Sequence, residues 1–131
     1  MKKIVENEKI TLVYHEADKI VHHTIHHEIS GEDFRSVLLK GSDIFEEEGA
    51  TKWLSDDRAN GPFNEEDTDW SINVWSKKVV AAGWKFWALV LPEDVIGKLT
   101  LQGIVDFYAE MGVTVQIFSD PDEAMRWLKS V

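Results

Sequence analysis

Two carboxylates and a guanidinium stand together at Asp56, Asp57 and Arg58, directly after a short apolar run. Paired carboxylates can exchange protons with a substrate, and an adjacent arginine can bind a carboxylate, a phosphate or a partner protein. A turn follows, because Asn60 precedes a Gly-Pro pair. Ligands of open α/β sheets usually bind at the carboxyl ends of the strands. We therefore predict a binding surface formed by Asp56, Asp57, Arg58 and Asn60.

Three other interpretations of these residues stay open. Side chains alternate along an extended chain, so Asp57 is expected beside a helix amino terminus while Asp56 and Arg58 share the other face. That arrangement would also fit an ion pair and an Asx turn that only shape the loop. An acid-base enzyme would use Asp56 or Asp57. A Mg²⁺ site completed by Asp120 would need adjacent strand ends, which a sequential strand order disfavours.

Histidines are the next side chains that could do chemistry. They lie close together at positions His15, His22, His23, His26 and His27. If residues 16–19 form a turn, His15 lies across from Ile20 and His22 from Val13, so no two imidazoles directly oppose one another. Zinc needs several ligands about 2 Å from one ion, and the chain has no cysteine. We predict no metal site and no cofactor, and expect a pH-sensitive sheet face instead.

Six tryptophans are many for a chain of 131 residues. Trp70, Trp75 and Trp127 fall on predicted helix faces, and Trp53 and Trp87 on predicted strands. Their spacing is typical of a hydrophobic core. The alternative is that rings near Trp87 line a pocket for a small apolar ligand.

Composition excludes several classes of function. A formal net charge of −10 repels nucleic acids. No apolar run is long enough for a signal peptide or a membrane span, and the absence of cysteine fits a reducing compartment. No Gly-x-Ser-x-Gly elbow or phosphate-binding glycine loop is present. We expect one cytoplasmic domain over residues 1–131, without nucleic-acid binding or membrane insertion.

The elements that must position these residues alternate between strands and helices. Apolar and β-branched runs predict strands at 10–15, 20–26, 52–56, 86–91 and 113–118. Apolar residues at helical spacing predict helices that begin after Ser30, after Asn64, at Leu101 and after Asp120. Ser30 and Asp33 predict a capping box at the first helix.

This order predicts an α/β fold with a mixed, mostly parallel sheet that begins with a β-hairpin and carries an antiparallel strand at one edge. Residues 86–91 are apolar on both faces, which is typical of a central parallel strand. Residues 113–118 alternate between apolar and polar side chains. Since crossovers are right-handed, we expect helices mainly on one face and strands in sequential order.

Residues 83–92 and 112–128, with the block from Trp53 to Arg58, resemble a group of small, largely uncharacterised bacterial proteins of the SpoIIAA-like, or STAS, fold. The resemblance runs from the hairpin to the carboxyl terminus and implies one antiparallel edge strand followed by a β-α superhelix. Anti-sigma-factor antagonists of this type are phosphorylated at the serine of an Asp-Ser-(Ser/Thr)-Gly motif. Here that loop reads Asp56-Asp57-Arg58-Ala59-Asn60-Gly61, and the nearest serine, Ser55, lies on the strand side.

These residues favour a non-enzymatic, STAS-like protein-interaction or regulatory module. The alternatives are a carrier of a small apolar ligand and, third, the acid-base enzyme described above. If helices cover one face only, a partly apolar sheet face stays open for a protein partner or a homodimer. That face is expected to comprise Thr11, Val13, His15, Ile20, His22 and Thr24.

Overall fold

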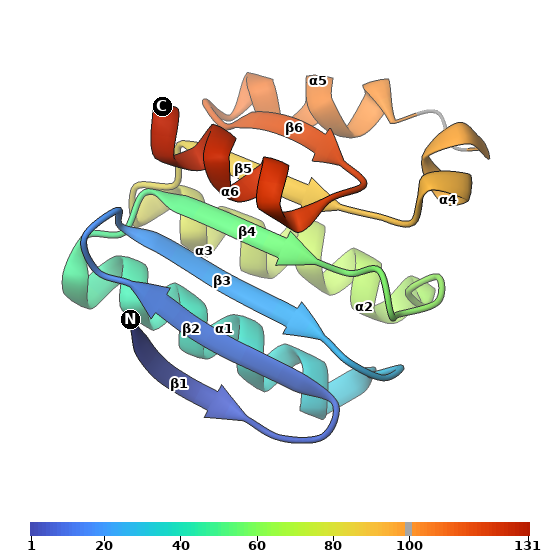
Figure 1. Cartoon of the computed structure of the whole chain (residues 1–131), viewed down its shortest axis with the longest axis horizontal. Helices are drawn as coiled ribbons and strands as arrows, with labels where there is room; N and C mark the ends of the chain where they lie inside the picture. Colours follow the sequence, from blue (N-terminus) through green and yellow to red (C-terminus); the bar gives the residue numbers. More distant parts are fainter. Residues whose placement is uncertain (99–100) are drawn as a thin grey trace.

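A mixed six-stranded sheet organises residues 1–98 and 101–131, the part of the chain that the computed structural model describes. Its strands lie in the order in which they follow one another along the chain (Figure 1). They are β1 (Lys2–Glu6), β2 (Ile10–His15), β3 (Ile20–Ile25), β4 (Lys52–Asp56), β5 (Phe86–Val90) and β6 (Thr114–Phe118). The pairs β1-β2 and β2-β3 are antiparallel, and β3 to β6 run parallel. The predicted mixed α/β sheet and its sequential order are confirmed.

Helices connect the parallel strands and follow the last one. They are α1 (Gly31–Glu48), α2 (Glu65–Trp70), η1 (Ser71–Trp75), α3 (Ser76–Ala81), α4 (Glu93–Lys98), α5 (Gln102–Glu110) and α6 (Pro121–Ser130). The segments α2, η1 and α3 follow one another without a break, and η1 between them is π-helical. Among the described residues, no helix has the length and apolar character needed to cross a bilayer.

The two faces of the sheet are covered unequally. Among the described helices, α1, α3 and α5 lie on one face, and α6 lies alone on the other, over the parallel strands (Figure 1). The larger core contains the buried rings of Trp53, Trp75 and Trp84. The smaller core is closed by Ala124 and Leu128 of α6. The prediction that helices lie mainly on one face is confirmed, with α6 as the exception.

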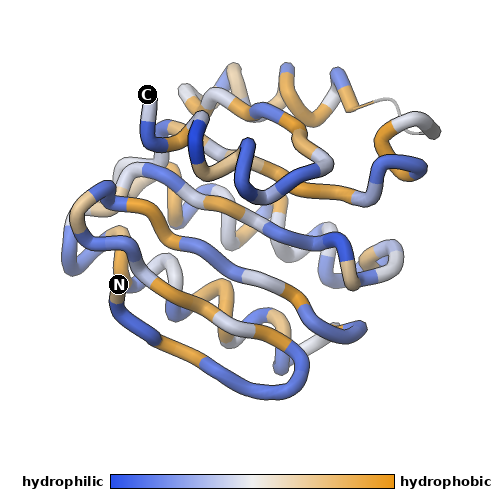
Figure 2. Tube along the Cα trace, viewed as in Figure 1, coloured by the Kyte–Doolittle hydropathy of each residue, from blue (hydrophilic) through white to orange (hydrophobic). Residues whose placement is uncertain are grey.

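The hairpin register is as predicted, but its place in the sheet is not. His15 lies opposite Ile20 and Val13 opposite His22. The edge strand, however, is β1, which the sequence did not reveal because it is short and charged at both ends. Its turn into β2 is made by Asn7, whose side chain accepts hydrogen bonds from the amides of Lys9 and Ile10. Figure 2 shows this turn as hydrophilic.

The helix ends follow the sequence signals at two of three sites. Asn64 accepts a bond from the Asp67 amide, and Asp120 accepts one from the Asp122 amide, as N-cap residues do. The capping box predicted for Ser30 and Asp33 is wrong, because the Ser30 side chain makes no cap bond. Asp67, from α2, takes over this role and accepts the Gly31 amide at 3.0 Å.

The open sheet face is less apolar than predicted. Ile20 is fully buried because α6 packs over it, and only 8% of Val13 is exposed. Four partly exposed polar side chains remain there, namely Thr11, His15, His22 and Thr24. The expected apolar association surface is therefore absent from these six residues.

Candidate functional site

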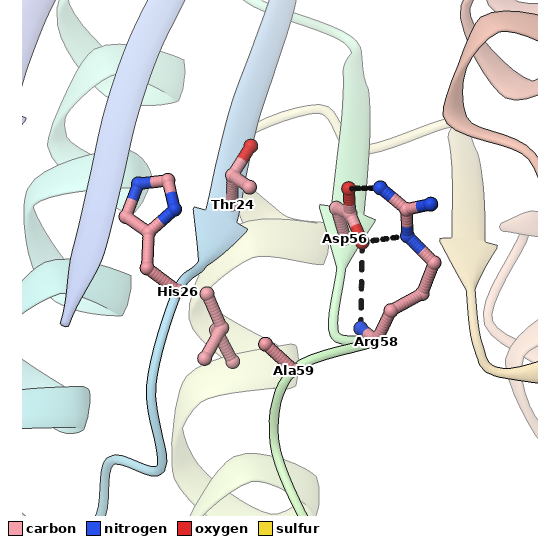
Figure 3. Close-up of a pocket in the computed structure, with 6 residues that line it drawn as sticks. Thr24, His26, Asp56, Arg58 and Ala59 are labelled. Carbon is pink, nitrogen blue, oxygen red and sulfur yellow. Dashed lines mark hydrogen bonds and ion pairs between the residues drawn. The ribbon is translucent and has the colours of Figure 1, made fainter.

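A shallow depression of about 380 Å³ lies where β3 and β4 end. Figure 3 shows the side chains around it, with Arg58 folded back onto Asp56. The lining residues are Thr24, Ile25, His26, Asp56, Arg58 and Ala59. Two of the four predicted binding residues, Asp56 and Arg58, therefore line one surface at the carboxyl edge of the sheet.

Asp56 and Arg58 form a two-pronged ion pair. Arg58 donates from Nε to Asp56 Oδ1 and from Nη2 to Oδ2, each at 2.9 Å, and its amide reaches Oδ1 at 3.3 Å. The Asp56 side chain is 5% exposed and that of Arg58 is 45% exposed. The hydrogen bonds that Arg58 donates to Asp56 raise the pKa of Arg58 against a smaller effect of burial, and the charges of Asp56, Asp120 and Asp122 add to the rise. Both oxygens of Asp56 hold the arginine in place, so this carboxylate is not arranged as a free acid or base.

Asp57 points to the opposite face of the sheet, as the alternation predicts. Its carboxylate is bonded to the ring of His23. Its Oδ1 lies 2.7 Å from Nε2 of His23, which is buried. The indole Nε1 of Trp53 donates to His23 Nδ1 at 3.0 Å. Because an indole nitrogen only donates, Nδ1 must accept, and the neutral His23 ring carries its proton on Nε2 and donates it to Asp57.

This chain of Trp53, His23 and Asp57 is a structural element and not a proton relay to a substrate. Both ring nitrogens of His23 are occupied within the chain, so neither faces a substrate. Asp56 and Asp57 lie on different faces and do not form a pair of carboxylates around one reacting bond. The geometry gives the acid-base interpretation of these residues no support.

Asn60 is also bonded within the chain. Its side-chain oxygen accepts the Ile29 amide at 3.0 Å, which ties the loop after β4 to the segment after β3. The Asn60 amide in turn donates to the Asp57 carbonyl at 3.1 Å. Asp57 and Asn60 therefore fix the loop, whereas Arg58 and Ala59 are exposed on it.

Ser55, at the end of β4, and Trp84, close to Trp87, are both buried. Ser55 is 2% exposed and its hydroxyl accepts the indole N–H of Trp87 at 2.9 Å, so the serine beside the loop is closed to a kinase. The ring of Trp84 lies 5.3 Å from that of Trp75 and 5.4 Å from that of Trp87. These rings pack on one another, as predicted for a core, and the depression at Asp56 lies elsewhere.

His15 and His22 meet diagonally across β2 and β3, a contact that direct cross-strand pairing does not show. His15 Nε2 lies 3.2 Å from His22 Nδ1, and the ring centroids are 5.4 Å apart. The distance between the centroids is about the nitrogen–nitrogen distance plus one ring radius on each side. The two nitrogens therefore point at one another, as in an N–H···N hydrogen bond. A metal ion bound by both rings would need the lone pairs of the two nitrogens to point at the ion and not at one another. Among the described residues, no three His, Asp or Glu side chains are gathered as metal ligands.

The stability of the fold is expected to fall as the solution becomes acidic, because of His22. Burial, helped by His15 and His23, lowers the pKa of His22 from 6.5 to about 4. The unfolded chain therefore binds this proton at a higher pH than the folded chain. The neutral ring of His22 makes its full contribution to the free energy of unfolding above pH 6.5. Below that pH the free energy of unfolding falls by roughly 1.4 kcal/mol per pH unit, down to pH 4.

Urea unfolding at several pH values between 7 and 4.5 measures this loss. We expect the His22→Gln variant to lose less stability on acidification than the unmodified chain. His27→Gln serves as the control, since His27 is exposed. Equal pH dependence in all three proteins would contradict the assignment to His22.

Comparison with known proteins gives no significant match to a family model, a curated protein or a solved structure. The STAS-like family and its functions therefore stay predictions from the residues.

Proposed function

We propose that this chain is a STAS-like, non-enzymatic interaction module that recognises a partner protein through the loop after β4. The observation that carries the proposal is the exposed display of Arg58 on a loop that buried neighbours hold in place. Asp57 anchors the loop to His23, and Asn60 anchors it to the Ile29 amide. A rigid scaffold that presents an exposed charged loop is a common arrangement for recognition.

The charges around Arg58 constrain the chemistry of the partner. Asp56, Asp120 and Asp122 all act on the guanidinium, so carboxylates outnumber cations at this surface. An acidic partner would be repelled, whereas basic and hydrogen-bonding groups would fit. The same excess of carboxylates argues against a free phosphate as the ligand.

Site-specific photocrosslinking tests the proposal. A photoreactive phenylalanine analogue replaces Ala59 in one protein and Lys85 in a matched control. Both positions are exposed. Lys85, however, directly precedes β5, so it lies at the amino ends of the parallel strands, whereas Ala59 follows the carboxyl end of β4. In native cell extract we expect one dominant protein adduct from position 59 and none from position 85.

Competition identifies the surface that forms the adduct. An excess of the unmodified chain is expected to suppress the adduct, and an excess of a folded Arg58→Ala variant is expected to leave most of it. Equal adducts at positions 59 and 85 would contradict the proposal. So would the absence of any adduct together with a co-purifying small molecule in native mass spectrometry, which would favour the carrier interpretation.

A further inference from the structure

The two edges of the sheet differ in how they are protected. On β1, Lys2, Lys3 and Glu6 are charged, and the pairing register shifts between Lys3 and Val5. Charges and irregular pairing of this kind prevent a second chain from adding to a sheet edge. The opposite edge, β6, reads Thr-Val-Gln-Ile-Phe, without charge or proline, and pairs with β5 in an unbroken register.

Val115 and Ile117 direct their backbone groups away from the sheet. The Thr114 amide donates to the Lys85 carbonyl, and the Phe118 carbonyl accepts the Leu91 amide, so residues 114, 116 and 118 face β5. Backbone groups of alternate residues point to opposite sides of a strand. Within residues 1–98 and 101–131, no strand lies beyond β6 (Figure 1), and the amides and carbonyls of Val115 and Ile117 have no ladder partner.

We propose that β6 is the interface with a second copy of this chain, paired antiparallel about a two-fold axis at Gln116. In this register Val115 of each copy exchanges two backbone hydrogen bonds with Ile117 of the other, four in all. Gln116 then lies opposite Gln116 of the second copy, in a pair without backbone hydrogen bonds. The two sheets join into one that is continuous across the axis.

The sequence of β6 fits itself in this direction. A strand that pairs with its own copy about a two-fold axis sets each residue before the axis opposite the residue equally far after it in the second copy, so these pairs must be compatible. Thr114 lies opposite Phe118 of the second copy, and the apolar Val115 lies opposite the apolar Ile117, both on the face that carries the larger core. Because each chain carries a net charge of −10, self-association needs a segment without like charges in opposition. The strand β6 provides such a segment.

Helix α5 adds apolar surface next to this edge. It packs on β6, and two of its large apolar side chains, Ile104 and Phe107, are 36% and 43% exposed. Exposed apolar side chains beside an unprotected strand edge favour a partner that covers both. The inference rests on β6 and α5 and does not depend on the function proposed for the loop after β4.

Charge reversal at the axis tests the proposed pairing. Gln116 is exposed, so Gln116→Lys and Gln116→Glu are expected to leave the fold intact, which circular dichroism verifies. Sedimentation velocity at micromolar concentration should show a dimer of the unmodified chain. Each variant alone places two like charges opposite one another and should dimerise about tenfold more weakly. An equimolar mixture, with one variant labelled with ¹⁵N, should form the mixed dimer preferentially in native mass spectrometry.

Crosslinking provides a second measurement that does not depend on charge. Because the chain has no cysteine, Gln116→Cys introduces a single thiol. Side chains in an antiparallel pair without backbone hydrogen bonds come close enough for a disulfide. We expect oxidation to link two Gln116→Cys chains but not two Thr114→Cys chains, since Thr114 lies opposite Phe118. A monomer throughout the micromolar range, or a dimer that none of the Gln116 substitutions changes, would overturn the proposal.

Discussion

Replacing Asp57 by alanine is expected to lower the free energy of unfolding by about 3 kcal/mol. The substitution removes the acceptor of the buried His23 N–H, which lies 2.7 Å from the carboxylate. Trp53 holds the other ring nitrogen, so the imidazole cannot turn towards water without breaking that bond as well. Chemical denaturation at pH 7.5 measures the difference.

The control for this prediction is Asp57→Asn. An asparagine oxygen can still accept the His23 proton, so we expect a loss of less than about 1 kcal/mol. Similar losses in the two variants would show that the charge of Asp57, and not its hydrogen bond, stabilises the loop. A negligible loss in Asp57→Ala would mean that the loop is not anchored through His23.

Gly41→Ala is expected to destabilise the chain by 3 kcal/mol or more, although alanine favours helices. A Cβ at Gly41 would overlap the indole of Trp53, and even Cζ3 of that ring would lie only 2.7 Å away. Trp53 is fully buried and contacts the rings of Phe45 and Trp75, so it has no space into which to move. Overpacking of this kind outweighs the gain of about 1 kcal/mol from helix propensity.

Gly97, in α4, is the matched control, because no atom beyond its chain neighbours and its own helix backbone lies within 4 Å of the position of a Cβ there. Gly97→Ala should be neutral or slightly stabilising. The double variant Gly41→Ala, Trp53→Phe relieves the overlap and should recover part of the stability lost in Gly41→Ala. Thermal unfolding followed by tryptophan fluorescence measures the melting temperature of each variant. Equal melting temperatures for Gly41→Ala and the unmodified chain would contradict the prediction.

The sequence predicts the fold well where a pattern depends on neighbours along the chain. The hairpin register from His15 to Ile20 follows from the length of its turn. The position of β5 between two parallel neighbours follows from its apolar residues, and Figure 2 shows hydrophobic residues along this strand. The sequence pattern does not predict β1, because five residues with charged ends bury too little apolar surface, and it does not predict the short helix α4.

The candidate site was predicted less completely because its contacts join distant segments. The positions of Asp56 and Arg58 on one face follow from alternation along the segment in which β4 ends. The bond between Asp57 and His23 depends on the parallel register of β3 and β4, which places His23 beside Ser55. That register joins two strands that α1 separates along the chain, and no local pattern encodes it. The diagonal contact of His15 with His22 does not follow from the pairing of directly opposed residues.

The position of α6 has a consequence for the order in which the chain can fold during synthesis. Every strand pairs with its predecessor, so the sheet can grow one strand at a time from the amino terminus. The apolar residues Ile20, Leu54 and Ala88 lie on the face that, among the described helices, α6 alone covers, and α6 follows the last strand. They therefore stay in contact with water until the ribosome has released the segment from Pro121 onwards. During that interval the growing chain exposes an apolar sheet surface that chaperones recognise, even though its larger core can already be packed.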